Sequence, residues 1–188
     1  MQFAKDSFFL ALQQRLAALN PARTVTINGA TVPAIVVVEN LPPSSAKPEA
    51  NTFYIEWGEA EVLLAKASNS PMMSLDVVIS YYSTGSVASM VDRGRLLAQL
   101  DSELLGICEP PNTEKRDYTQ SPSVDLGTCV FWTQPSFSEG KGSGMYWGRT
   151  SFPERVRSGV TDSAETSQDA RVERKARVTI YFFSEVTL

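Results

Sequence analysis

The 188-residue chain is 43% hydrophobic and 20% charged, with a formal net charge of −4. That composition fits a domain with a packed core and disfavours both a disordered chain and a dedicated nucleic-acid binder. Because the chain has no histidine, a Ser-His-Asp triad, a Cys-His pair and the commonest metal ligand are excluded.

The N-terminal segment predicts an amphipathic helix. Asp6 or Ser7 is its expected cap, and Asn20-Pro21 ends it. Four residues spaced by three or four positions form its apolar stripe: Phe9, Leu12, Leu16 and Leu19. Polar residues interrupt the apolar run and no cleavage site follows, so we do not expect this segment to be a signal peptide. No stretch is long enough to span a bilayer, and we therefore expect no membrane partner.

Four predicted strands follow, the first two of which form a hairpin. Asn28-Gly29 is the strongest hairpin signal in the chain, with Ala34 to Glu39 expected as an apolar second arm buried on both faces. "FYIEWGEAEVLLAK" predicts a strand bent at Gly58. "LDVVISYYS" predicts a strand in which Leu75, Val77, Ile79 and Tyr81 share one face.

A second helix is predicted after Gly85 and ends at Gly106. Ser86 is its expected cap, and Gly94 is interpreted as a point of close packing. Its apolar stripe consists of Val87, Met90, Leu97, Leu100 and Leu104. The turn holds one glycine where a dinucleotide fingerprint needs three, so we interpret it as a structural turn.

Residues 112–168 are predicted to be an insertion or extended arm within a single domain that spans 1–188. The segment is rich in Ser, Thr, Gly and Pro, yet it carries more aromatic residues than a disordered linker would. "GTCVFWTQ" and "GMYWGRT" predict the strands of an inserted hairpin, and "PSFSEGKGSG" between them is flexible by composition. Its "EGKGSG" lacks the spacing of a P-loop.

The segment "RVERKARVTIYFFSEV" predicts a closing strand with one buried face. That face consists of Val172, Ala176, Val178, Ile180 and Phe182, and Arg174 interrupts it. The expected fold class is therefore α/β (α+β). It has a mixed sheet with an N-terminal helix and one central amphipathic helix packed on one face, plus the inserted β-hairpin or arm.

Six residues are candidates for a subunit or ring interface. Two arginines lie on or near the polar side of the second helix, and three aromatic residues could either contact a partner or close the chain's own core. The candidates are Arg93, Arg95, Trp132, Tyr146, Trp147 and Arg149. Reversal of the charges at Arg93 and Arg95 is expected to weaken assembly without unfolding the monomer.

Four segments, in this order, resemble the tail terminator proteins of long-tailed bacteriophages, the minor tail protein U type. They are "FFLALQQRLAAL", "VPAIVVVE", "LDVVISYYSTGSVASMVDRGRLLAQLDSELLG" and "ARVTIYFFSEV". The resemblance implies a mixed sheet with helices on one side and a homo-oligomeric ring, usually a hexamer. That ring caps the tail tube, stops its polymerisation and offers a surface to the head connector.

The resemblance also implies the partners and the location. The partners are further copies of the chain, the major tail tube protein and the head-tail connector, while DNA only passes through the lumen. It implies no catalytic residues, no cofactor and no metal. The protein would be made in the host cytoplasm and end in the virion, at the head-proximal end of the tail.

Three other functions stay open. A head-tail connector or other neck protein could share the same broad fold. A Mg²⁺-dependent nuclease could use Glu173 and Lys175 with Asp162 or Asp169, although the first two also fit the solvated face of a strand. A disulfide between Cys108 and Cys129 would favour a secreted binding module, whereas two reduced thiols are typical of a cytosolic protein.

Overall fold

The computed structural model describes residues 1–41, 49–64, 71–83, 90–109, 116–117, 124–125, 130–139 and 172–183. The expected turn at Gly85 with its cap Ser86, and the predicted strand "GMYWGRT", lie outside these residues. The elements are, in chain order, α1 (Gln2–Leu19), β1 (Thr24–Ile27), β2 (Ala30–Pro33), β3 (Ile35–Val37), the 3₁₀ turn η1 (Val38–Asn40), β4 (Phe53–Leu64), β5 (Met72–Ser83), α2 (Met90–Ile107), β6 (Arg116–Asp117), β7 (Val124–Asp125), β8 (Val130–Trp132), β9 (Ser136–Glu139) and β10 (Val172–Phe183).

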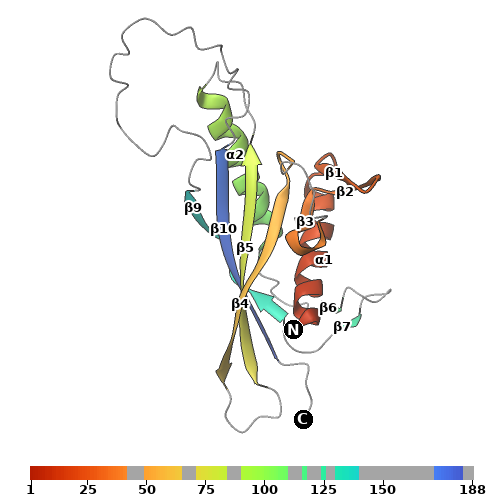
Figure 1. The fold of residues 1–188 in the computed structure, drawn as a ribbon, viewed down its shortest axis with the longest axis vertical. Helices are drawn as coiled ribbons and strands as arrows, with labels where there is room; N and C mark the ends of the chain where they lie inside the picture. Colours follow the sequence, from red (N-terminus) through yellow and green to blue (C-terminus); the bar gives the residue numbers. More distant parts are fainter. Residues whose placement is uncertain are drawn as a thin grey trace, which may run out of the picture.

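Six of these strands form one mixed sheet. Its order is β3-β4-β5-β10-β8, and β9 also pairs with β10. The β3–β4 pair is parallel and the other pairs of this sheet are antiparallel. The long strands β4, β5 and β10 run side by side along the length of the molecule (Figure 1). The predicted class, α+β with a mixed sheet, is confirmed.

Both helices pack on one face of the sheet, which we call the helix face. The odd-numbered residues of β5 from Leu75 to Tyr81 and the even-numbered residues of β10 from Ala176 to Phe182 are each at most 1% exposed. They form one core cluster with Leu12 and Leu16 of α1 and with Leu97, Leu100 and Leu104 of α2. The alternation predicted for both strands is therefore confirmed.

The first helix differs from its prediction in its start and in its orientation. It begins at Gln2, so the predicted caps Asp6 and Ser7 lie inside it, and it ends before Asn20 as predicted. Phe8 is fully buried and Phe9 is only half-buried. The predicted stripe counted large side chains, whereas the buried stripe also includes Ala4 and Ala11, whose small size lets the helix lie close to the sheet.

The predicted hairpin at Asn28-Gly29 is confirmed. Asn28 has φ 50° and Gly29 has φ 82°, the left-handed pair that a tight two-residue turn needs. The second arm is β2, from Ala30, and not Ala34 to Glu39 as expected. Because the turn has only two residues, Ile27 pairs directly with Ala30. β3, which is buried at all three residues, instead pairs with β4 in the main sheet.

Two glycines should respond in opposite ways to alanine. Gly29→Ala is expected to lower the free energy of unfolding by about 1 kcal/mol, because a Cβ is disfavoured at positive φ. Gly94 lies inside α2, and a Cβ there would meet nothing within 4 Å. The interpretation of Gly94 as a close-packing point is thus wrong. Gly94→Ala is expected to raise the same free energy by roughly 0.5–1 kcal/mol. Urea denaturation measures the free energy of unfolding of both variants. A lower value for Gly94→Ala than for the wild type would contradict the exposed placement of Gly94.

The predicted bend at Gly58 is a β-bulge. The register of β4 on β5 shifts between Trp57 and Ala60, and a Cβ at Gly58 would lie 3.0 Å from the backbone oxygen of Asp76. Beyond the bulge, β4 and β5 continue past the end of both helices (Figure 1). We call this extension, residues 61–64 and 72–74, the distal arm.

Within the predicted insertion, β6 and β7 pair with each other in a separate two-stranded sheet, whereas β8 and β9 belong to the main sheet. β8 confirms the strand expected in "GTCVFWTQ", but it pairs with β10. Ser136 to Glu139, expected to be flexible, form β9 and also pair with β10. The composition of this segment indicated flexibility, but β10 offers it an edge of backbone groups that needs partners.

Candidate interaction surface

The face of the sheet opposite the helices, which we call the outer face, is the main candidate for contact with other molecules. One corner of it is covered, where β1 and β2 pack Val25 against Val36 and Tyr54. Elsewhere, the contacts found among the described elements place none of them over this face. Antiparallel sheets commonly bury one face and leave the other solvated, so the part of the outer face that no described element covers is a candidate for contacts with other molecules.

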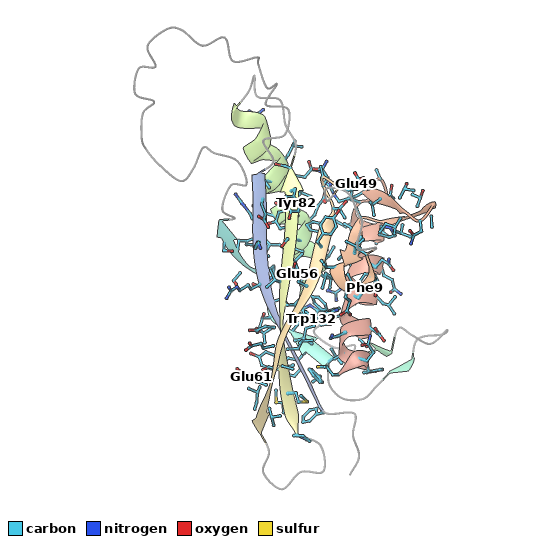
Figure 2. The ribbon with its side chains drawn as sticks, viewed as in Figure 1. Phe9, Glu49, Glu56, Glu61, Tyr82 and Trp132 are labelled. Atoms are coloured by element: carbon cyan, nitrogen blue, oxygen red, sulfur yellow. The ribbon has the colours of Figure 1, made fainter. Side chains whose placement is uncertain are left out.

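Charges of opposite sign occupy opposite sides of the outer face. On β4, Glu56 and Glu61 are exposed on this face, with Glu59 between them at the bulge. Figure 2 labels Glu56 near the middle of β4 and Glu61 in the distal arm. On β10, Lys175 and Arg177 project from the same face. In the described part of the chain, Glu56, Glu61 and Arg177 form no ion pair.

The residues proposed for a nuclease lie on this face as a pair. Lys175 Nζ is 3.3 Å from Glu173 Oε1, and Asp162 and Asp169 lie outside the described residues. Burial raises the pKa of Tyr82, and the negative charge of nearby Glu173 raises it further. Among the described side chains, no three from histidine, cysteine, aspartate and glutamate are grouped so that they could hold a metal.

Large apolar side chains are exposed at the margins of the sheet. Val62 is 55% exposed and Leu63 44% on β4, Phe137 is 38% exposed on β9, and Phe183 is 42% exposed at the end of β10. Single exposed apolar residues are ordinary, but these lie at both edges of one sheet and in its distal arm. Met1, Leu19 and Leu105, at or in the helices, are also exposed, so apolar exposure is shared between the helices and the sheet margins.

Trp132 lies inside the chain's own core. It is 6% exposed, its Nε1 donates to the backbone oxygen of Cys108 at 3.2 Å, and its ring meets that of Phe8 edge-on at 5.1 Å. Arg15 stacks over it at 5.6 Å. Of the two interpretations, partner contact and self-packing, the structure shows self-packing for Trp132.

The other interface candidates divide into one described and four undescribed side chains. Arg95 is exposed on α2. The side chain of Arg93 lies outside the described residues, as do Tyr146, Trp147 and Arg149. Of the six candidates, the structure therefore describes two side chains: Trp132 in the core and Arg95 in the helix layer, away from the outer face.

Two ionic networks hold α2 in place, and the sequence prediction missed both. Glu103 is 8% exposed and accepts from Asn20 Nδ2 at 2.9 Å, Arg23 Nη2 at 2.9 Å and Gln99 Nε2 at 3.1 Å. Burial alone would raise the pKa of Glu103, but these donors, Arg23 first, bring it below its usual value. Glu103 therefore stays ionised within the fold.

The second network explains why Arg174 interrupts the apolar face of β10. Arg174 pairs with Asp101 of α2, which also accepts from the hydroxyl of Tyr81. Burial, followed by the contact with Asp101, raises the pKa of Tyr81 well above its usual value. A charged residue at a core position was the sequence signal for this network, since such a residue needs a partner.

Neither Cys108 nor the depression beside β1 has the character of a reactive site. Cys108 is a free, buried thiol, and burial raises its pKa to about 12, so it carries almost no thiolate at neutral pH. The depression is lined by Thr24, Val25, Thr26, Glu49, Ala50 and Thr52. Glu49 is the single titratable side chain in that lining, so no acid–base pair converges there.

Comparisons with known proteins identify no relative: no family model matches the chain, and no curated protein is significantly similar to it in sequence. No described helix is long and apolar enough to cross a membrane. The proposal for the function therefore depends on the order of the elements and on the surfaces described above.

Proposed function

We propose that this chain is a structural assembly protein of the tail-terminator kind, which forms a ring on the end of a phage tail tube. One observation supports this most directly. The four segments that carry the resemblance become α1, β3, the β5–α2 unit and β10, and they meet in a single body. In that body, β3, β5 and β10 share one mixed sheet, and α1 and α2 pack on the same face of it.

The available surfaces fit the demands on such a ring. A ring subunit needs two different patches for its neighbours, because a ring is built from heterologous contacts. It needs further surfaces for the tube below and the connector above. The sheet supplies two edges, an outer face and a distal arm, while the helices occupy the other face. A net charge of −4 suits a lumen that DNA crosses without being held.

Particles made without this protein test the proposal. Electron microscopy is expected to show tails of irregular length that do not join heads, because nothing would stop tube polymerisation or receive the connector. Complementation with the intact gene should restore one tail length. Tails of normal, uniform length attached to heads would contradict the proposed function.

A pull-down separates the terminator from a connector of the same broad fold. The tagged chain is expected to retain the tube protein when tails are assembled. Retention of portal or adaptor proteins, without the tube protein, would instead assign the chain to the connector. No catalytic role is part of either proposal.

A further inference from the structure

The two edges of the main sheet are complementary to each other. On one side, β3 pairs with β4 only from Phe53 to Ile55. Beyond Ile55, no described strand pairs with that side of β4. We call β4 residues 56–64 the acidic edge. On the other side, β9 pairs with β10 and with no other described strand. We call β9, together with Lys175 and Arg177 of β10, the basic edge.

The charges complement each other on the outer face. The acidic edge presents Glu56 and Glu61 there. At the basic edge, Ser138 lies opposite Lys175 and Ser136 opposite Arg177, and both serine hydroxyls turn back to the β10 backbone. Serine is small, so a carboxylate from a strand beside β9 could reach across it to either cation. Neighbouring strands are about 4.8 Å apart, so the backbones on either side of β9 are roughly 10 Å apart, a gap that a glutamate and a lysine or arginine side chain can bridge between them.

The apolar side chains complement each other on the helix face. Val62 of the acidic edge lies opposite Met73, and Phe137 of the basic edge lies opposite Ala176, so both point to the helix face. Val62 is 55% exposed and Phe137 is 38% exposed. A sheet that continued from one edge to the other would keep its faces. It would therefore place the carboxylates near the cations and bring the two apolar side chains to the same face.

The strand directions also agree. β4 and β10 both run antiparallel to β5, and β9 runs antiparallel to β10. If a second copy continues the sheet in the same sense, its β9 runs antiparallel to β4 of the first. Four of the five pairs within the main sheet are already antiparallel.

We propose that the acidic edge of one copy of this chain pairs with the basic edge of the next copy, so that the sheet continues from subunit to subunit. The occupant of the acidic edge is thus β9 of a second copy, with Lys175 and Arg177 of that copy behind it. The contact is heterologous, and it closes into a ring when the rotation between copies divides a full turn. This inference rests on the proposed function, because it takes the protein to act as a ring. It deepens that proposal by naming the surface through which the ring forms.

Charge exchange tests this contact with purified full-length protein. One variant, Glu56→Lys with Glu61→Lys, has two basic edges. The other, Lys175→Glu with Arg177→Glu, has two acidic edges. Lysine protects a strand edge from unspecific pairing as well as glutamate does, so the first variant changes complementarity and leaves that protection in place. Sedimentation velocity and native mass spectrometry measure assembly.

The wild type is expected to self-associate, and each variant is expected to associate at least about tenfold more weakly, because like charges then face each other. An equimolar mixture of the two variants should assemble with alternating subunits. A chain that carries all four substitutions should associate like the wild type. If the edge variants were only less stable, neither their mixture nor the chain with all four substitutions would recover assembly. Thermal melts check that each variant is folded.

A matched control places the same change in charge on the helix layer. Asp6→Lys with Glu109→Lys should leave assembly unchanged. The proposal is overturned if the wild type stays monomeric at its solubility limit, if both edge variants assemble like the wild type, or if their mixture does not recover. Should one edge variant fail to fold, its neutral form, Glu56→Gln with Glu61→Gln or Lys175→Gln with Arg177→Gln, must show a smaller loss in the same direction. This assay uses isolated protein, whereas the proposed function is tested by tail length in particles made without the protein. A negative result for edge pairing can therefore be told apart from a negative result for the proposed function.

Discussion

Phe8→Ala is expected to lower the free energy of unfolding by about 3–5 kcal/mol, the usual loss for an aromatic side chain removed from a core. Phe8 is fully buried. Its ring meets Trp132 at 5.1 Å and Trp57 at 6.4 Å, both edge-on, so its removal opens a cavity between α1 and the sheet. Equilibrium denaturation in urea, with the slope compared between proteins, measures the loss.

Phe9→Ala is the matched control, because the same chemical change occurs one position further along the same helix. Phe9 is half-buried at the margin of the core, so its loss is expected to be about 1 kcal/mol, in proportion to the smaller area it buries. A larger effect for Phe9→Ala than for Phe8→Ala would mean that α1 presents a different face to the sheet.

Glu103→Ala should be the most damaging charge deletion among the described residues, with a loss of about 3 kcal/mol or more. Removal of one partner of a buried ion pair leaves the other charge without compensation. Here Arg23 would be left, since its side chain is 12% exposed and pairs with Glu103. Glu109→Ala, at an exposed site just beyond α2, is the control and should stay within roughly 0.5 kcal/mol of the wild type.

A double-mutant cycle and a pH series identify the cause of that loss. Arg23→Ala with Glu103→Ala should lose less than the sum of the single losses, by about 1–3 kcal/mol. The pKa of Glu103 is lower in the folded state than its usual 4.5. The stabilisation is therefore full above about pH 4.5 and disappears as the pH falls through the folded-state pKa. The difference between wild type and Glu103→Ala should shrink over that range, and a constant difference would exclude the ionised carboxylate as the source.

The sequence predicted the parts of the fold that repeat. In β5 and β10 the buried side chains alternate with the exposed ones, so a period of two is enough to place Val77 and Val178 in the core. The sequence also predicted the hairpin at Asn28-Gly29, because few residue pairs favour two positive φ angles in succession. These features are local, so the sequence alone specifies them.

The features that the sequence did not predict depend on contacts between distant residues. The choice of Phe8 over Phe9 depends on how α1 meets the sheet, and helical spacing alone admits either. The two networks around Glu103 and Asp101 join residues that are far apart in the chain. The sequence showed Arg174 as an exception to the apolar face of β10, but it did not show that Asp101 is its partner.

The candidate surface shows the same limit. An alternating strand does not reveal which of its edges lacks a partner, so the acidic edge and β9 became visible only with the strand order. β9 itself was hidden by a composition typical of a flexible segment. Conversely, Trp132 was predicted as a partner contact because aromatic residues favour interfaces, and the structure shows that it packs against Phe8 of α1.

The position of β10 also affects how the protein is made. β10 follows every other described element in the chain, yet it lies inside the sheet, between β5 on one side and β8 and β9 on the other. Directly paired residues such as Val77 and Val178 are about a hundred residues apart, and such pairings form slowly because a long loop must close first. Until β10 has been synthesised, the edge of β5 that pairs with β10 lacks its partner, although α1, β4 and α2 all come earlier in the chain. Only a chain translated through residue 183 can therefore complete the main sheet.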